Sequence, residues 1–191
     1  MAKSTQSKEY KSRIRREKRR RFLRVIFELI IVVLLAAVTA FLLFSSVILQ
    51  ESAMSPTLEA GNQVFVNRAA YALTGVRRGD VIAYRSSGTF DSGIHVKRVI
   101  GLPGETVQIR DGLILINGKT YIESREFPNI TNPGIAENSV RLGSNEYFVL
   151  GDNRNDSADS REPTVGNINR SVIMGKAFWR IFPIRHFGPV R

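Results

Sequence analysis

The chain begins with a polar, basic stretch that is followed by a long apolar run. Residues Leu29 to Leu49 read LIIVVLLAAVTAFLLFSSVIL and contain no charged side chain. As an α-helix this run would extend roughly 31 Å, about the thickness of the hydrocarbon layer of a bilayer. A secretory signal peptide would have a shorter apolar stretch, and Ser45-Ser46-Val47 offers only a weak cleavage site. The pattern therefore predicts a retained transmembrane helix over about residues 25–49.

Beyond residue 50 the apolar positions fall into short runs that are rich in β-branched and aromatic residues, as is typical of strands. Asp111-Gly112 and Asn117-Gly118 lie between such runs and are typical of tight hairpin turns. Residues 123–144 contain Pro, Gly and several Asn, which indicates a long loop or a small inserted lobe, and residues 68–76 suit one short helix. The fold class is therefore mainly β, behind one N-terminal transmembrane helix. The expected strands are Gln63–Asn67, Asp80–Tyr84, Val96–Ile100, Thr106–Ile109, Leu113–Ile116, Tyr147–Leu150 and Lys176–Ile181.

The positive charge is concentrated before the apolar run. Of the 28 Lys and Arg residues, 11 lie in residues 1–24 against two acidic residues, Glu9 and Glu17, so this tail holds +9 of the formal +11. The remainder is nearly neutral, which argues against nucleic acid as a partner. The positive-inside rule places the tail in the cytoplasm and the rest of the chain outside, as a single-pass protein of the cell membrane. The tail is either a solvated topology signal or a contact with anionic lipid headgroups of the bilayer.

These patterns divide the chain into three parts. Residues 1–24 form a basic cytoplasmic tail, residues 25–49 a transmembrane helix, and residues 50–191 an extracytoplasmic β domain with a small inserted lobe around 105–146. The chain of 191 residues has no cysteine, which excludes disulfides, cysteine-based zinc sites and a cysteine nucleophile. Its two histidines leave little for a metal site or a Ser-His-Asp triad. We expect no cofactor and no metal.

Lys97 stands inside a strand pattern, where alternation places it on one face with Val99 and places Val96 and Arg98 on the other. A lysine on an apolar face loses hydration, which lowers its pKa and suits it to act as a general base. The alternative is an open sheet face from which Lys97 reaches solvent.

A polar stretch, Gly151 to Arg161, follows the apolar run Tyr147–Leu150. Its acidic residues do not have the spacing of an EF-hand calcium loop. Asp159 and Arg161, with Asp152 and Arg154, instead suggest a salt-bridged loop beside a site.

Three stretches in this order resemble the type I signal peptidases, membrane-bound Ser/Lys proteases that remove signal peptides outside the cytoplasmic membrane. They are Met54–Leu58 (MSPTL) directly after the apolar run, Val96–Gly104 (VKRVIGLPG), and Gly151–Arg161 (GDNRNDSADSR). The chain looks most like the short, single-anchor form of Gram-positive bacteria, over roughly residues 25–185. The resemblance implies a signal-peptidase-like β fold.

The same resemblance implies roles for individual residues. It makes Lys97 the general base, Ser157 a residue that orients the Lys97 amine, and Asp159 with Arg161 a supporting ion pair. Met54 and Pro56 belong to the stretch around the nucleophile.

The chain departs from the family at the nucleophile itself, where it has Ala53. A methyl group cannot attack a carbonyl carbon. Ser52 and Ser55 are adjacent, but successive side chains of an extended chain point in opposite directions. Glu51 is a second departure, since the family usually has glycine or serine there, beside the oxyanion hole. A carboxylate at that place would oppose a developing oxyanion and favour the charged form of Lys97.

The sequence therefore predicts a membrane protein of the signal peptidase I family that acts on or binds signal peptides of exported proteins. Ala53 predicts lost or strongly reduced peptidase activity, in a natural family member or an engineered inactive variant. One alternative is an active peptidase that uses the displaced serine Ser52. Another is a non-catalytic chaperone or assembly factor for secreted surface proteins. Expected partners are extended signal peptides or preproteins, the lipid bilayer, and an active paralogue or a surface-protein assembly machinery.

Overall fold

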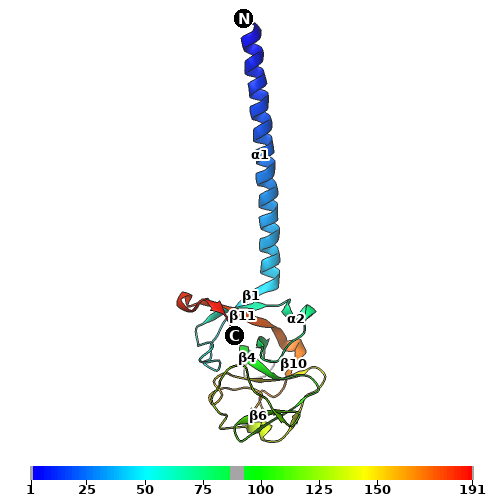
Figure 1. Cartoon of the computed structure of the whole chain (residues 1–191), viewed down its shortest axis with the longest axis vertical. Helices are drawn as coiled ribbons and strands as arrows, with labels where there is room; N and C mark the ends of the chain where they lie inside the picture. The colour runs from blue at the N-terminus through cyan, green and yellow to red at the C-terminus, as the bar shows by residue number, and fades with distance from the viewer. Residues whose placement is uncertain (1, 87–92, 191) are drawn as a thin grey trace. The chain divides into compact units, whose positions relative to one another are not determined.

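The computed structural model describes residues 2–86 and 93–190, and the chain divides into two units, 1–42 and 43–191. The first unit is formed by the helix α1, Ala2–Leu43, whose last residue is assigned to the second unit. Within it, residues Lys18–Phe41 are long and apolar enough to cross a membrane, judged by length and composition. Figure 1 shows this helix as one continuous ribbon.

The helix ends six residues before the expected residue 49, so the predicted end of the membrane segment was wrong. Phe44–Ile48 instead forms the strand β1, which pairs antiparallel with β2, Gln63–Asn67. In this register Val47 faces Val64 across the ladder, and both side chains are buried. Residues 44–48 pair with β2 on one side, and they form the edge strand of the eight-stranded sheet.

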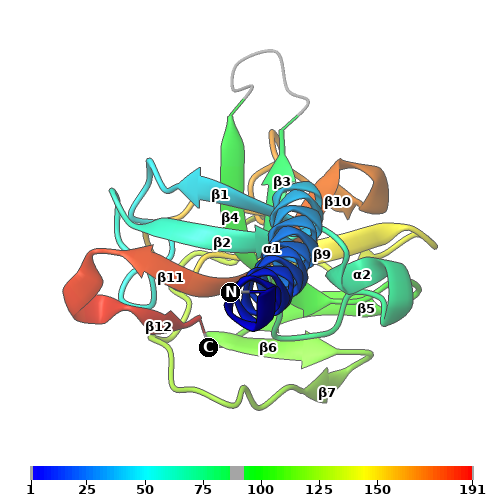
Figure 2. The same cartoon turned by 90° about the horizontal axis from the view of Figure 1, so that it is seen from above.

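The second unit is mainly β, as predicted, and is built on an eight-stranded antiparallel sheet. Its strands run in the order β1-β2-β11-β3-β4-β9-β10, with β12 paired to β11. Figure 2 shows β1, β2 and β11 side by side, with β12 next to β11. The further strands of this sheet are β3 (Val81–Arg85), β4 (Ile94–Gly101), β9 (Glu146–Leu150), β10 (Ile168–Asn169), β11 (Ile173–Phe182) and β12 (Gly188–Pro189).

A smaller, four-stranded sheet runs in the order β7-β6-β5-β8. Its two hairpin turns lie where the sequence predicts them, with φ of 53° at Asp111 and 51° at Asn117, each followed by a glycine of positive φ. Consecutive residues of positive φ are what a type I′ turn requires. The strands are β5 (Thr106–Arg110), β6 (Leu113–Ile116), β7 (Lys119–Thr120) and β8 (Val140–Arg141).

The short helices are single turns. The helix expected in residues 68–76 is present as α2, Ala70–Leu73. The stretch 123–144, expected as a loop or small lobe, contains only the 3₁₀ turn η1 and the strand β8 as regular structure. The 3₁₀ turns are η1 (Gly134–Glu137), η2 (Arg170–Val172) and η3 (Ile184–His186).

Strand β4 lies between β3 and β9 and is buried on both faces. Val96 packs in one hydrophobic cluster with Val64 and Met54, whereas Val99 packs in another with Ile82. The predicted alternation along this strand is therefore confirmed. Because Lys97 alternates with Val96, it lies on the opposite face, where its side chain is fully buried.

Candidate functional site

The loop between β1 and β2 carries residues 49–62 and is closed at its base by two backbone hydrogen bonds. Leu49 donates to the carbonyl oxygen of Asn62 at 2.9 Å, and Gly61 donates to that of Leu49 at 2.8 Å. Met54 and Leu58 are each 1% exposed and anchor the loop in the core. The residues between Leu49 and Met54 are thereby held against the sheet.

Ala53 is buried where this loop meets the polar stretch after β9. Its carbonyl oxygen accepts a hydrogen bond from the backbone N–H of Asn153 at 3.0 Å. Gly151 permits the close approach, because a side chain there would overlap both the carbonyl oxygen of Ala53 and the Oγ of Ser157. The fold therefore brings positions 53, 151 and 157 together from distant parts of the sequence.

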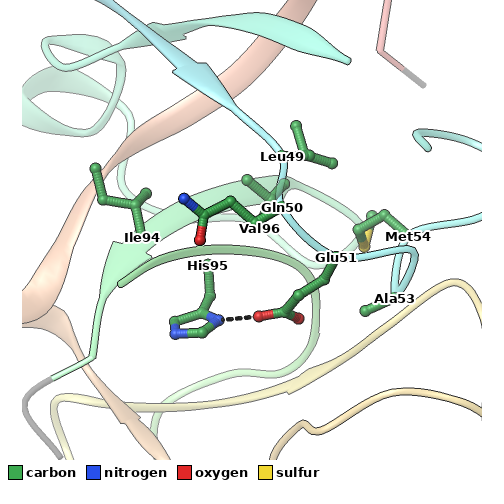
Figure 3. Close-up of a pocket in the computed structure, with 8 residues that line it drawn as sticks. All are labelled: Leu49, Gln50, Glu51, Ala53, Met54, Ile94, His95 and Val96. Carbon is green, nitrogen blue, oxygen red and sulfur yellow. Dashed lines mark hydrogen bonds and ion pairs between the residues drawn. The ribbon is translucent and has the colours of Figure 1, made fainter. Parts of the chain in front are cut away.

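Lys97 is fully buried in β4, and its amine is paired with a carboxylate. Nζ of Lys97 lies 3.0 Å from Oε2 of Glu51, which reaches β4 from the loop after β1. The other oxygen of the same carboxylate, Oε1, lies 2.7 Å from Nδ1 of His95 (Figure 3). Each oxygen of Glu51 thus has its own partner on β4.

The charge of Glu51 is strongly stabilised by this arrangement. The hydrogen bond from His95 lowers the pKa of Glu51 from 4.5 to about 2, and the positive charge of Lys97 acts in the same direction. The amine of Lys97 is thus held in an ion pair with this carboxylate at 3.0 Å. A general base must instead lie within hydrogen-bond reach of the group whose proton it takes, and here the partner of the amine is a carboxylate.

The neighbouring serines do not contact the amine. Ser52 is exposed, and its carbonyl oxygen accepts a hydrogen bond from the N–H of the half-buried Ser55. Across residues 2–86 and 93–190, Glu51 is the only hydrogen-bond partner found for Nζ of Lys97. Pro56, the other residue expected near the nucleophile position, is exposed.

Ser157 has a buried hydroxyl group. In the described part of the chain, its Oγ has no hydrogen-bond partner. The resemblance assigns this side chain to orienting the amine of Lys97, whereas in the structure that amine is bound to Glu51.

Two buried ion pairs support the polar stretch. Asp159 and Arg161 form a bidentate pair at 2.8 and 2.9 Å, and Asp159 also accepts the backbone N–H of Gly151. Asp152 forms a bidentate pair with Arg98 at 2.7 and 2.6 Å.

Asp152 and Arg154, the other two charged residues of the expected salt-bridged loop, each form an ion pair with a residue outside this stretch. Arg154 pairs with Glu123 and stacks over the ring of Phe127, 4.2 Å from its centroid. Asp152 also accepts a hydrogen bond from Thr57 Oγ1 at 2.5 Å. The Asp152–Arg98 pair thus links the loop after β1 to strand β4, a connection that local charge spacing could not reveal.

The role of His95 was missed by the sequence reasoning, which treated it only as one of two histidines. A signal was present, because residues two apart on a strand share a face and His95 is two residues before Lys97. Two nitrogen donors on one face would attract a nearby carboxylate such as Glu51.

A small pocket opens between the loop and the start of β4. Glu51 and His95 lie at its polar side, as Figure 3 shows. No group of three or more His, Asp or Glu side chains suited to a metal ion occurs in the residues that the structure describes. The pocket is lined by Leu49, Gln50, Glu51, Ala53, Met54, Ile94, His95 and Val96.

Comparisons with known proteins find the same family over most of the chain. A family model described as signal peptidase, peptidase S26, matches residues 21–182. The chain is 33% identical over 162 residues to signal peptidase I of Bacillus caldolyticus, covering 79% of this chain and 86% of that protein. It is 36% identical over 149 residues to signal peptidase I T of Bacillus subtilis, covering 74% and 75%.

A solved structure also matches, a signal peptidase I from Enterococcus faecalis, with 32% identity and a TM-score of 0.44, covering 54% of this chain and 97% of that one. The family model and the curated relatives alone decide the assignment, since the model spans residues 21–182 and the relatives align over most of their length. The chain belongs to the signal peptidase family, peptidase S26.

Proposed function

We propose that this chain is a membrane-anchored member of the type I signal peptidase family that binds signal peptides of exported proteins and has lost most or all peptidase activity. The proposal assigns position 53 to the missing nucleophile and Lys97 to the base that no longer has a serine hydroxyl to activate. Ser157 and the Asp159–Arg161 pair then belong to a site whose framework remains and whose reactive group is absent.

The observation that carries this proposal is the pairing of Lys97 with Glu51. A Ser/Lys enzyme needs an amine that takes a proton from a hydroxyl within about 3 Å. Here the amine lies 3.0 Å from a carboxylate, and the side chain at position 53 is a methyl group. Both halves of the expected dyad are therefore unsuited to acyl transfer.

The strand pairing supports a groove for an extended peptide. Strand β4 pairs with β3 from Ile94 to Arg98, but on its other side its described pairing with β9 begins only at Arg98. The start of β4 thus has one edge without a partner strand among the described strands. An extended peptide can add to such an edge through main-chain hydrogen bonds. The pocket between Leu49 and Ile94 lies beside this edge and would accept small side chains.

The helix α1 supports a single-pass anchor for the proposed function. Its apolar part is preceded by the tail of net charge +9, so the positive-inside rule places the N-terminus in the cytoplasm and the β unit outside. The candidate site, which belongs to the β unit, then lies outside the cytoplasm.

One assay tests the proposal. The full-length chain in vesicles is given a preprotein, and both cleavage and retention of its signal peptide are measured. The proposal expects retention without cleavage. Cleavage that is lost in Ser52→Ala would establish the displaced-serine alternative and overturn the proposal.

A further inference from the structure

The side chain of Glu51 occupies a ready-made cradle for a carboxylate. Its two oxygens are held by different donors, Lys97 Nζ at 3.0 Å and His95 Nδ1 at 2.7 Å. Both donors stand on the same face of β4, two residues apart. The cradle is therefore made by the sheet, and the carboxylate that fills it comes from elsewhere in the chain.

The partners differ greatly in how firmly they are held. The side chain of Lys97 is 0% exposed and that of His95 is 11% exposed, whereas the side chain of Glu51 is 43% exposed. Glu51 also lies in a loop beyond the end of β1, while both donors lie within a strand of the central sheet. Glu51 can rotate into solvent and be fully hydrated there, but Lys97 cannot. The carboxylate is thus the replaceable member of the cluster.

Whatever displaces Glu51 must satisfy the amine of Lys97. A buried ammonium without a partner is strongly unfavourable, and a neutral amide carbonyl compensates it poorly. A second carboxylate restores both charge-assisted hydrogen bonds. The ligand group that replaces Glu51 is therefore expected to be a carboxylate.

We propose that Lys97 and His95 form a binding site for the free C-terminal carboxylate of a peptide, which Glu51 fills in the unoccupied protein and vacates when such a peptide binds. The inference rests on the proposed peptide-binding function and deepens it. It assigns the ligand class as peptides that already end in a free carboxylate, the product of an earlier hydrolysis, in preference to uncleaved preproteins. Leu49, Met54 and Ile94 line the same pocket and would contact the last side chains of the peptide (Figure 3).

Competition from Glu51 has a measurable consequence. A group tethered in the same chain competes at an effective concentration of about the millimolar range or higher. Removing its carboxylate should therefore strengthen the binding of a peptide acid. It should do so less for a peptide amide, which cannot neutralise Lys97.

The test uses the full-length chain in detergent micelles and two fluorescent peptides of identical sequence ending in Ala-Gln-Ala. One peptide carries a free carboxylate and the other a C-terminal amide, and affinity is measured by fluorescence anisotropy. We expect the acid to bind about 10- to 100-fold more tightly, as a charge-assisted interaction predicts. Glu51→Ala should tighten the acid by about 10-fold or more and widen its preference over the amide.

Two variants act as controls. Glu59→Ala removes another exposed glutamate of the same loop and should leave both affinities unchanged. Lys97→Met fills the buried space with an apolar side chain and should abolish the preference for the acid, with folding checked by thermal unfolding. Glu51→Gln removes the charge of the carboxylate without a change in side-chain size. Like Glu51→Ala, it should tighten the binding of the acid.

The outcomes separate the two proposals. Equal binding of acid and amide overturns the carboxylate site and leaves peptide binding intact. A preference for the acid that is unaffected by Glu51→Ala and by Lys97→Met places the carboxylate elsewhere and also overturns the site. Binding of neither peptide overturns both the site and the proposed function.

Discussion

The backbone N–H of Asn153 donates to the carbonyl oxygen of Ala53 at 3.0 Å, so the polar stretch after β9 fixes the main chain at position 53. This contact does not involve the side chain of Ala53. A hydroxyl group added to Cβ would therefore be introduced on a backbone that is already held, and the effect of restoring it can be predicted from the surrounding side chains.

Ala53→Ser alone should give little signal-peptide cleavage, because Glu51 still holds the amine of Lys97. Ala53→Ser combined with Glu51→Gly should exceed the single variant by about 10²- to 10⁴-fold, the usual contribution of a functioning general base. Release of the mature protein from a preprotein in vesicles measures both. Adding Lys97→Ala should abolish the gain. Robust cleavage by the unmodified chain, retained after Ser52→Ala and Ser55→Ala, would contradict the assignment of position 53.

The pairing of Glu51 should contribute a pH-dependent stability. Its pKa is lowered from 4.5 to about 2, so the stabilisation is fully present above about pH 4.5 and is lost as the pH falls towards 2. Since Glu51 is 43% exposed, solvent screening limits the effect to about 1 kcal/mol or less. Thermal unfolding of the unmodified chain and of Glu51→Gln should differ at pH 6 and converge near pH 2.

The matched control for this pH dependence is Glu59→Gln, which changes an exposed glutamate in the same loop. Its difference from the unmodified chain should stay constant over the same pH range. A difference for Glu51→Gln that grows as the pH falls would contradict the predicted sign.

Asp152→Ala should destabilise the β unit by about 3–5 kcal/mol, because it leaves the buried guanidinium of Arg98 without its carboxylate. It also removes the acceptor of Thr57 Oγ1, which helps to hold the loop after β1. Urea unfolding in micelles measures the loss. Asp156→Ala, at an exposed position of the same stretch, should change stability by no more than about 0.5 kcal/mol. Equal effects of the two variants would show that the Asp152–Arg98 pair contributes no more to stability than an exposed aspartate.

The charge asymmetry around α1 predicts the orientation in the membrane. Protease added to intact protoplasts should digest the β unit and leave a fragment that contains the basic tail and the membrane segment. Disrupted protoplasts serve as the control, because there the tail becomes accessible as well. Survival of the β unit in intact protoplasts would reverse the predicted topology.

Local sequence signals were sufficient to predict much of the secondary structure of the β unit. The hairpin turns at Asp111 and Asn117 follow from residues that tolerate positive φ, and strand β6 was predicted with its observed bounds. The end of α1 was misjudged because Phe44–Ile48 is as apolar as a membrane helix. What decides its structure is pairing with β2, which lies some twenty residues further along the chain.

In the candidate site, too, local stretches could be predicted from the sequence, whereas contacts between distant residues could not. The stretches around positions 53, 97 and 157 were recognised from the sequence, and the fold brings positions 53 and 157 to the same glycine, Gly151. The contact of Glu51 with His95 and Lys97 depends on how the loop after β1 crosses to β4. The sequence indicated the partners only through the shared face of His95 and Lys97 on β4. Since the crossing joins residues more than forty positions apart, no local pattern could predict its direction.

The effect of substituting Ser157 should depend on the residues at positions 51 and 53, which is a case of epistasis. Within the described residues its buried hydroxyl has no partner, and such a group costs about 1–3 kcal/mol. Ser157→Ala should therefore be neutral or stabilising in the present chain. The resemblance to the family implies that Ser157 orients the amine of Lys97. In the background of Ala53→Ser with Glu51→Gly we therefore expect the freed amine to use the same hydroxyl, and Ser157→Ala to be harmful to activity. The sign of one substitution would thus depend on two other positions, which constrains the order in which a site of this kind can lose or regain its chemistry.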